Sequence, residues 1–316
     1  MRAWQFTSTH APLVRADVPE PVAGPGQVLV AVRAAGLCHS DVGLMEDEGW
    51  LSMLAKRPIT IGHEVAGVVA EIGPGVSGWQ VGDRVGVCPT TPAGAPGYAY
   101  DGGYADRLVV DAQTLVRVPD NVSLALAAMG TDAGMTSHHA IMAAGGLKAG
   151  MKLGIIGLGG LGQIGARIGV LTGAEVFVAE IDQRVWPVGE ALGVRRMAAS
   201  IREFASENLD LIVDLAGFGT TTAEAIETVR PGGRVVQVGM GRLEATISTK
   251  ALILRRVTLL GSAGGTKEDV EGIYRHFASG QLAPVLTEIG FDDIADGLDR
   301  LRRGEVTGRL VAILPG

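Results

Sequence analysis

The sequence contains few cysteines and few aromatic residues. Among its 316 residues there are two cysteines, Cys38 and Cys88, and aromatic residues make up 4%. Two cysteines exclude a framework of disulfides and favour a reducing, cytoplasmic setting. Because aromatic side chains are scarce, the core has to be built from Val, Leu, Ile and Ala. Such a core favours parallel strands that are buried on both faces.

The sequence also lacks an excess of basic residues and an apolar run that could span a membrane. Its formal net charge is −7, whereas nucleic-acid-binding proteins normally carry a basic excess or stripe. The longest apolar stretch, 153–179, is interrupted by Gln163, Arg167 and Glu175 and is not expected to cross a bilayer. The N-terminal segment MRAWQFTSTH lacks the apolar centre of a signal peptide. We therefore expect a small-molecule partner, with no nucleic acid and no membrane.

Glycine, in contrast, is abundant. There are 47 glycines in 316 residues, about twice the usual share of ~7%. They stand between short apolar runs, which indicates turns and close backbone contacts. Up to about residue 120, these runs predict a compact, mainly β domain. The clearest strands are expected at 27–33, 64–72, 82–87 and 104–110, with a helical turn starting near Cys38.

The pattern changes near Ser123, a plausible helix N-cap. From there to about Ala144, Ala, Leu and Met recur at helical spacing. Apolar strands then alternate with helical patterns, and this alternation predicts βαβ units and a parallel sheet. The strands are expected at 153–156, 175–179, 209–216, 234–238 and 257–260, with helices notably at 161–171 and 222–229. Two further helical stretches and a last strand at 309–314 follow residue 263.

A glycine-rich segment follows the first of these strands and opens a helix. It reads Gly157-Leu158-Gly159-Gly160-Leu161-Gly162. In this context the glycines permit a tight turn, close approach of a pyrophosphate and close helix–strand packing. The alternative is a structural turn in a domain that binds another ligand.

An acidic residue at the end of the next strand supports dinucleotide binding. Glu180 lies at the expected distance of about 20 residues from the glycine segment. A carboxylate there accepts the hydroxyls of the adenosine ribose and repels a 2′-phosphate, so we expect NAD and not NADP. Glu180 as a surface charge at the strand end, with Asp182 as the rival acid, remains open.

Cysteine, histidine and acidic residues suggest a metal site in the β-rich part. The segments are Cys38-His39-Ser40-Asp41 and Gly62-His63-Glu64. All three residue types bind zinc, and a catalytic site needs three protein ligands and one open position. Taken alone, Cys38 is as well explained as a buried apolar residue, and His63 as an ordinary core or surface histidine.

The sequence resembles the zinc-containing medium-chain dehydrogenases/reductases over nearly its whole length. The resemblance rests on ordered short matches: GLCHSD at 36–41, GHEVAG at 62–67, GDRV at 82–85, DGGYA at 101–105, DAGMT at 132–136, the glycine segment and Gly308-Arg309. It implies a doubly wound Rossmann domain, here expected at 135–262, and a mainly β GroES-like catalytic domain, expected at 1–134 and 263–316. The active site would lie in the cleft between them.

The resemblance implies that zinc is held by Cys38, His63 and Asp132. Glu64 is implied as a second carboxylate that reaches the metal transiently, and Asp41 as the carboxylate that orients the histidine ligand. For Asp132, a helix N-cap remains the alternative. The implied activity is that of an NAD-linked alcohol dehydrogenase, in which zinc acts as Lewis acid and a hydride passes to the nicotinamide.

Further residues are implied by the same resemblance to contact the cofactor or move a proton. Ser40 would start the proton path, and His39 and Arg309 would contact the pyrophosphate. Leu161 and Thr136 are expected near the nicotinamide, and Val238 is a further candidate at the end of its strand. For Arg309, a solvated charge at a strand end is the alternative.

The sequence departs from the family in three places. A surface lobe with four cysteines and a structural zinc is reduced to about a dozen residues with one cysteine, Cys88, so we expect one zinc per chain. The position of a frequent relay histidine is Gly43, with His138 and His139 as weak substitutes. Gly264 and Gly265 stand where relatives often have aromatic residues. With Trp50, Leu51 and Met53 as an apolar wall, this suggests a wide site for bulky alcohols or ketones.

Two other functions remain open at this stage. One is a zinc-free quinone or enone reductase of the same superfamily. The other is a nucleotide-binding descendant without turnover. The apolar strand at 257–260 is expected at a sheet edge, where it would support a homodimer or homotetramer.

Overall fold

The computed structural model describes residues 1–315, which form two compact units. The first unit consists of Met1–Ala133, Thr266–Gly280 and the segment from Leu286 onward. The second consists of Gly134–Gly265 and Gln281–Val285. The sequence analysis expected all of 263–316 in the first unit, whereas 281–285 belongs to the second unit.

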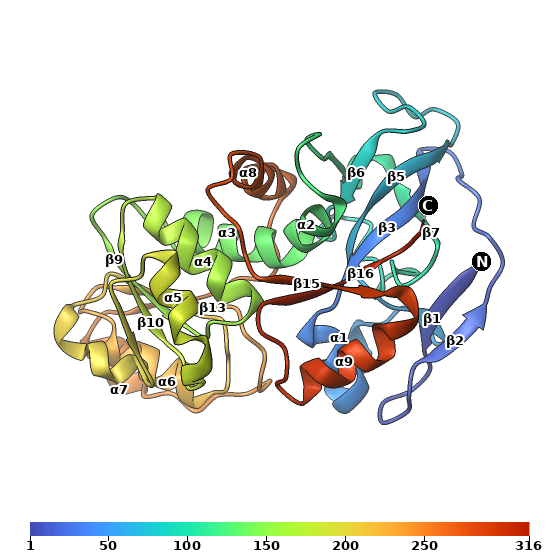
Figure 1. Cartoon of the computed structure of the whole chain (residues 1–316). Helices are drawn as coiled ribbons and strands as arrows, with labels where there is room; N and C mark the ends of the chain where they lie inside the picture. The colour runs from blue at the N-terminus through green and yellow to red at the C-terminus, as the bar shows by residue number, and fades with distance from the viewer. Residues whose placement is uncertain (316) are drawn as a thin grey trace. The chain divides into compact units, whose positions relative to one another are not determined.

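The first unit is built on a mixed sheet in which the C-terminal strand lies beside an N-terminal one (Figure 1). The strand order is β15-β16-β3-β5-β6-β8, with β7 also paired to β3. Their bounds are β3 Gln27–Gly36, β5 Glu64–Ile72, β6 Arg84–Val87, β7 Arg107–Asp111, β8 Leu115–Arg117, β15 Leu286–Gly290 and β16 Arg309–Ile313. A smaller sheet, β2-β1-β4, comprises β1 Arg2–Phe6, β2 Val14–Asp17 and β4 Ile59–Thr60.

In the first unit, the strands that the sequence analysis did not anticipate are short or exposed. They are β1, β2, β4, β8 and β15, of two to five residues each. β2 and β15 are largely exposed and therefore carry no buried apolar pattern. Their pairing is decided by partners distant in the chain, which a local pattern does not reveal.

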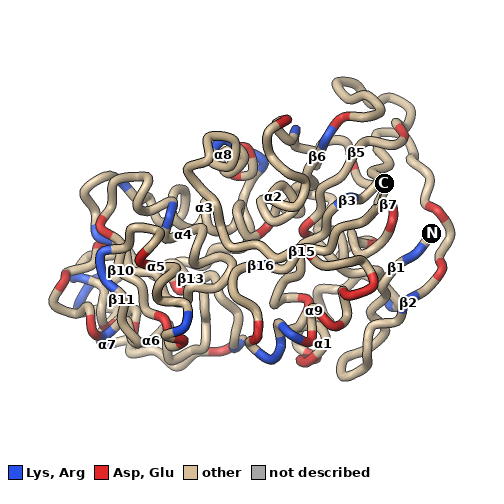
Figure 2. Tube along the Cα trace, viewed as in Figure 1, with Lys and Arg blue, Asp and Glu red and all other residues tan. Residues whose placement is uncertain are grey.

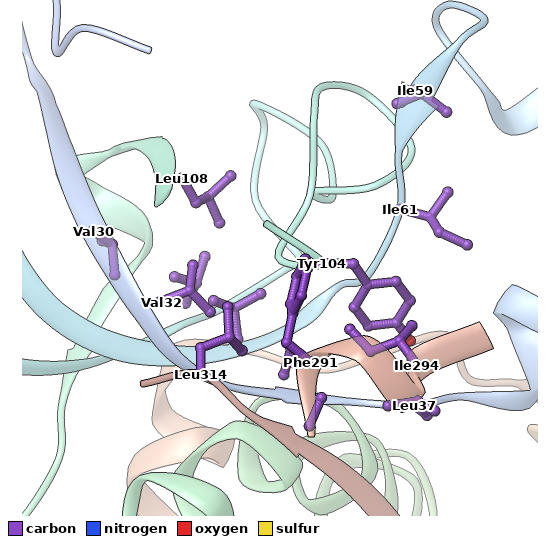
Figure 3. Packing of buried hydrophobic residues seen from close by; sticks show 14 of the residues in the cluster. Val30, Val32, Leu37, Ile59, Ile61, Tyr104, Leu108, Phe291, Ile294 and Leu314 are labelled. Carbon is purple, nitrogen blue, oxygen red and sulfur yellow. The ribbon is translucent and has the colours of Figure 1, made fainter. Parts of the chain in front are cut away.

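The core of the first unit is aliphatic with a few aromatic rings. Figure 3 shows Tyr104 packed among residues that include Leu37, Ile61 and Ile294. Tyr104 and these three neighbours are fully buried. The helical elements of this unit are α1 His39–Glu46, η1 Glu48–Met53, η2 Ala112–Thr114, α2 Leu124–Met129, α8 Lys267–Ala278, η7 Phe291–Asp293 and α9 Ile294–Arg302.

The helical stretch that begins at Ser123 is interrupted twice. Ser123 caps α2, since its hydroxyl accepts a hydrogen bond from the Leu126 amide at 3.2 Å. The expected helix to Ala144 forms, but two segments of it are π-helical. The elements after α2 are η3 Gly130–Gly134, α3 Met135–His138 and η4 His139–Ala144. Such π turns are uncommon and often occur at functional sites.

The second unit contains a six-stranded, all-parallel sheet in the order β11-β10-β9-β12-β13-β14. The strands are β9 Lys152–Ile156, β10 Glu175–Ala179, β11 Arg196–Ala198, β12 Leu211–Asp214, β13 Arg234–Gln237 and β14 Thr258–Gly261. The main helices between them are α4 Gly160–Leu171, α5 Trp186–Leu192, α6 Thr220–Thr228 and α7 Thr249–Leu254, with the short 3-10 turns η5 Gln183–Val185 and η6 Ile201–Glu207.

The strand order reverses between β9 and β12, which both lie at the centre of the sheet. In doubly wound sheets, ligands bind at this point, beyond the carboxyl ends of the strands. The expected α/β class, a doubly wound parallel sheet together with a mainly β unit, is confirmed. Among residues 1–315, every helix is too short or too polar to traverse a bilayer.

Candidate metal centre and nucleotide-binding loop

Three separate segments of the first unit bring four potential ligands together. Cys38 is the N-cap of α1, His63 and Glu64 stand at the start of β5, and Asp132 lies in the π turn η3. One ligand atom from each of these four residues lies within 4.8 Å of the others. The residues named from the sequence as zinc ligands therefore converge at one point.

The donor set and its distances fit a zinc ion. Oδ2 of Asp132 lies 3.6 Å from Cys38 Sγ and 3.5 Å from His63 Nε2. Sulfur, imidazole nitrogen and carboxylate oxygen are the donors that zinc prefers. Cys38, His63 and Glu64 are buried and Asp132 is half-buried, and a cation here would offset the cost of burying so much negative charge.

The position of Asp132 inside a helical run excludes the alternative that Asp132 is a helix N-cap. The N-cap of the run is Ser123, and Asp132 lies in the π turn that follows α2. Asp132 is therefore not a helix N-cap. The preceding Gly130 lies against Tyr274, because a Cβ there would stand 2.8 Å from the Tyr274 ring. Close packing of this kind fixes the backbone next to Asp132.

Arg309 forms a buried ion pair with Glu64. Its Nε donates to Glu64 Oε2 at 3.1 Å, and Nη2 of the same guanidinium contacts Glu64 Oε1. Nη2 also lies 3.6 Å from Asp132 Oδ2. With 3% of its surface exposed, Arg309 is not a solvated charge at a strand end, and that alternative is wrong.

The charges around Cys38 and His63 shift the pKa values of these two side chains in opposite directions. Burial raises the pKa of the Cys38 thiol, but the Arg309 guanidinium and a hydrogen bond from His63 bring this pKa below its ordinary value. Burial lowers the pKa of His63, but Asp41, Asp132 and Cys38 together raise it well above its ordinary value. The thiol is therefore prepared for metal binding, whereas the imidazole has to lose a proton before its nitrogen can bind a metal.

Ser40 and Asp41 flank His63 on its two ring nitrogens. Ser40 Oγ is 3.4 Å from His63 Nε2, and Asp41 Oδ1 is 3.5 Å from His63 Nδ1. The ring nitrogen that faces Asp132 is thus also the one beside Ser40. His39, which precedes Ser40 in α1, is exposed.

The position of the missing relay histidine is covered by a tryptophan. A Cβ at Gly43 would stand 2.7 Å from Cε2 of Trp50, whose side chain is buried in η1. No larger side chain fits at residue 43 while Trp50 keeps this position. Of the three residues expected to form an apolar wall, Trp50 is buried, Leu51 is half-buried and Met53 is 43% exposed.

The segment after β6, where a structural-zinc lobe was expected to be reduced, contains Cys88 as its one cysteine. Cys88 is fully buried, and burial raises the pKa of its thiol. Within residues 1–315, the four-residue cluster above is the only group of three or more His, Cys, Asp or Glu side chains found close enough to hold a metal.

In the second unit, the glycine segment forms the turn between β9 and α4. Gly157 has φ +90°, a conformation that favours glycine. A Cβ at Gly162 would stand 2.0 Å from the Gly157 carbonyl oxygen, whereas a Cβ at Gly159 would meet nothing within 4 Å. Gly160 and Leu161 open α4. The three motif glycines thus supply a turn, an open backbone and a close helix contact, as the sequence predicts.

Glu180 lies against this glycine turn. Its carboxylate accepts hydrogen bonds from the Leu158 amide at 2.6 Å and from the Asp182 amide at 2.8 Å. The rival acid, Asp182, is paired with Arg184 at 2.8 Å. Glu180 is therefore more than a surface charge at the strand end, because it organises the loop that follows β9.

The remaining predicted residues of the second unit lie on separate elements. Thr136 is buried in α3, and Val238 directly follows β13, where its amide donates to the Asp214 carbonyl at 3.0 Å. His138 and His139 are half-buried on the helical run after Asp132.

Two tyrosines beside the metal ligands were missed by the sequence analysis. The Tyr104 hydroxyl is 2.7 Å from Asp41 Oδ2, and the Tyr98 ring centroid is 5.6 Å from that of His63. The matching segment at 101–105 contains Tyr104 but gave no reason to assign it a role. For Tyr98 the sequence offers no signal.

Two family models match the chain. The "Alcohol dehydrogenase GroES-like domain" matches residues 24–120 and "Zinc-binding dehydrogenase" matches residues 160–279. An alcohol dehydrogenase of Geobacillus stearothermophilus is 30% identical, over 98% of this chain and 99% of its own. A probable cinnamyl alcohol dehydrogenase 2 of Picea abies is also 30% identical, over 91% and 88%.

Solved structures give the same result. Acetophenone reductase of Geotrichum candidum, in complex with NAD, has a TM-score of 0.92 and 28% identity, with coverage of 99% and 97%. An alcohol dehydrogenase of Aeropyrum pernix has a TM-score of 0.91 and 27% identity, with coverage of 99% and 100%.

The chain belongs to the zinc-dependent medium-chain dehydrogenase/reductase family. Within it, the chain is an oxidoreductase of the alcohol dehydrogenase type, with small-molecule alcohols or ketones as substrates and with NAD and zinc as the cofactors of the group. The expected family, fold class and general activity are thereby confirmed.

Proposed function

We propose that this alcohol dehydrogenase holds one zinc ion per chain with Cys38, His63 and Asp132 and transfers the hydride to NAD. The observation that carries the proposal is the convergence of these side chains, with Glu64, within 4.8 Å. When bound, zinc supplies Lewis acidity that lowers the pKa of an alcohol, and NAD accepts the hydride. A zinc-free quinone or enone reductase would have no use for this buried donor set.

The other polar groups of the centre have separate roles in the proposal. Ser40 accepts the proton that the alcohol loses, because its hydroxyl lies beside the Nε2 face of His63. Since Trp50 covers Gly43, the next carrier is the ribose or water and not a side chain at residue 43. Glu64 stays paired with Arg309 and serves as a transient ligand only when that pair opens.

In this proposal, the second unit, at roughly 135–262, binds the nucleotide. The turn at Gly157, Gly159, Gly160 and Gly162 takes the pyrophosphate, and Glu180 takes the ribose. Leu161, Thr136 and Val238 are assigned to the nicotinamide end, and His39 and Arg309 of the catalytic unit, roughly 1–134 and 263–316, to the pyrophosphate. Support comes from the geometry of the glycine turn and from the position of Glu180 against it.

The proposed substrates are primary or secondary alcohols and the matching aldehydes or ketones, in a site wide enough to admit bulky ones. The lobe is short, and Gly264 and Gly265 add no side-chain bulk. Among the similar proteins are an acetophenone reductase and probable cinnamyl alcohol dehydrogenases, whose names denote aromatic substrates. We also propose that no structural zinc is bound, since the lobe carries Cys88 alone.

A homodimer or homotetramer is proposed from the edge of the parallel sheet. β14 is the last strand of this sheet, and the preceding helix exposes 68% of Ile253 and 71% of Leu254. Exposed apolar groups beside an open edge favour pairing with a second copy. A cytoplasmic location is proposed from the low cysteine content.

Metal analysis combined with substrate profiling tests this function. We expect about one zinc per chain, activity that is lost on chelation and restored by zinc, and comparable turnover of small linear and bulky cyclic secondary alcohols with NAD. Cys38→Ser should lose zinc and alcohol turnover yet still bind NADH, because its effect is confined to the metal centre.

Three results would contradict parts of the proposal. A purified protein without zinc that reduces quinones or enones would favour the zinc-free reductase. A wild-type protein as inert as Cys38→Ser towards a broad alcohol panel would favour a binding protein without turnover. Strict preference for ethanol would exclude the wide substrate site.

A further inference from the structure

We infer that Tyr104 is a positioning residue of the metal centre, which holds Asp41 so that Asp41 in turn orients the zinc ligand His63. The inference rests on the proposed function, because it concerns the affinity of the same site for zinc. The polar neighbours of the Tyr104 hydroxyl are Asp41 and the Gly36 carbonyl. The influence of Tyr104 would pass through one buried carboxylate.

The first step is the contact between Tyr104 and Asp41. The tyrosine hydroxyl lies 2.7 Å from Asp41 Oδ2 and 3.1 Å from the Gly36 carbonyl oxygen. Both side chains are fully buried. Burial and the nearby Asp41 charge raise the pKa of Tyr104 well above its ordinary value, so the hydroxyl keeps its proton. It has one proton to donate, and the shorter, charge-assisted partner is Asp41.

The second step is the division of labour between the two oxygens of Asp41. Oδ2 accepts from Tyr104 and from the Cys38 amide at 3.2 Å. Oδ1 lies 3.5 Å from His63 Nδ1 in a buried ion-pair contact, and neither atom is engaged in a hydrogen bond elsewhere in the described residues. With Oδ2 saturated by two donors, Oδ1 is the oxygen left to face the imidazole.

This arrangement fixes which nitrogen of His63 faces the metal. A proton on Nδ1 that points to Asp41 leaves the lone pair of Nε2 for zinc. Nε2 is the nitrogen 3.5 Å from Asp132 Oδ2. The same carboxylate also holds the backbone of Cys38. Asp41 thereby connects two of the three proposed ligands, and Tyr104 holds Asp41.

The fold holds Tyr104 tightly against the segment that leads to His63. The Tyr104 amide donates to the Ile61 carbonyl at 3.0 Å, and its carbonyl accepts from the Trp4 amide at 2.8 Å. Gly62, with φ +98°, lies under the ring, because a Cβ there would stand 2.4 Å from Cδ1 of Tyr104. The ring is also fully buried in the hydrophobic core (Figure 3), so the hydroxyl has little freedom to leave Asp41.

Tyr98 provides a matched comparison at the same histidine. Its ring lies beside the His63 ring, with centroids 5.6 Å apart. Its hydroxyl is also buried, and it lies beside Ser40. Loss of this hydroxyl leaves the contacts of Asp41 intact.

The test measures the zinc affinity of full-length Tyr104→Phe and Tyr98→Phe by competition with a chelator of known affinity. We expect Tyr104→Phe to bind zinc about 10-fold more weakly, in the range seen when groups behind a metal ligand are removed. Tyr98→Phe should stay within about twofold of wild type. The absorption bands of the cobalt-substituted protein should shift in Tyr104→Phe, because the geometry of His63 changes.

A double-mutant cycle with Asp41→Asn separates positioning from general destabilisation. In the Asp41→Asn background, Tyr104→Phe should add less than about twofold, since there is no carboxylate left to hold. Equal zinc affinity of Tyr104→Phe and wild type, or an unchanged 10-fold loss in the Asp41→Asn background, would overturn the inference. If wild type itself bound no zinc, the proposed function would fail and the inference with it.

Discussion

Glu180 is the residue whose contacts bear most directly on the choice of nucleotide. Its carboxylate lies against the glycine turn and accepts hydrogen bonds from the backbone amides of Leu158 and Asp182. A negative charge held at this place attracts ribose hydroxyls and repels a 2′-phosphate. Asp182 stands two residues further on, with its charge already paired to Arg184.

We expect Glu180→Ala to lower kcat/KM with NAD about 10-fold and to raise the ratio of NADP to NAD efficiency. A 10-fold loss corresponds to about 1.4 kcal/mol, the order of one charge-assisted hydrogen bond. Steady-state kinetics with both nucleotides measures it. Asp182→Asn is the matched control and should leave the ratio nearly unchanged. A larger change in Asp182→Asn than in Glu180→Ala would make Asp182 the discriminating acid.

At the scale of elements, the turn between β9 and α4 separates two reasons for a glycine. Gly162 is needed for packing, because a Cβ there would collide with the backbone of Gly157. Gly159 has open space around its Cα, so packing does not require a glycine here, and in the proposed nucleotide site the bare backbone would let the pyrophosphate approach.

We therefore expect Gly162→Ala to lower the free energy of unfolding by about 1–3 kcal/mol, the usual cost of overpacking. Gly159→Ala should change it by less than about 0.5 kcal/mol yet weaken NAD binding. Denaturant unfolding without nucleotide and NAD titration measure the two effects. An unfolding midpoint of Gly162→Ala equal to that of wild type would show that the turn relaxes more easily than its contacts suggest.

At the scale of the whole molecule, the residues proposed for metal binding and those proposed for nucleotide binding belong to different units. The four potential metal ligands all lie in the first unit, and the glycine turn and Glu180 lie in the second. Acidic and basic residues are interspersed along the chain (Figure 2).

The ion pair between Arg2 and Asp106 makes stability depend on pH. Arg2 Nη2 lies 2.6 Å from Asp106 Oδ1, and the Arg2 amide donates to Oδ2 at 2.7 Å. Burial raises the pKa of Asp106, but its hydrogen bonds with Arg2 outweigh this and hold the pKa below its ordinary value. Because the pKa is lower in the folded state, the charged carboxylate stabilises the folded protein at pH values above the unfolded pKa of about 4. This stabilisation is lost as the pH falls through the folded pKa.

We expect Asp106→Asn to cost about 0.5–1 kcal/mol at pH 7, a value reduced because both side chains are partly exposed. The difference from wild type should shrink below about pH 4, where Asp106 of the unfolded chain gains its proton, and should disappear as pH falls through the lower folded pKa. Urea unfolding at several pH values measures this. A difference that stays constant from pH 7 to pH 3 would show that the charge of Asp106 is not responsible.

Much of the fold followed from the sequence because its signals are local. The long buried strands of the parallel sheet, the N-cap at Ser123 and the glycine turn each depend on a few neighbouring residues. Short exposed strands such as β2 and β15 were not predictable, since their pairing is decided by partners distant in the chain. The π turns were missed because a helical pattern does not reveal one extra residue per turn.

The sequence by itself determined the family, the two kinds of unit and the identity of the residues that converge at the candidate metal centre. Tertiary structure decided what each of them touches: Arg309 meets Glu64, Trp50 covers Gly43, and Tyr104 meets Asp41. These partners lie up to 245 residues apart. Contacts of this kind depend on how strands and loops pack, and a local pattern of residue types carries no information on that packing.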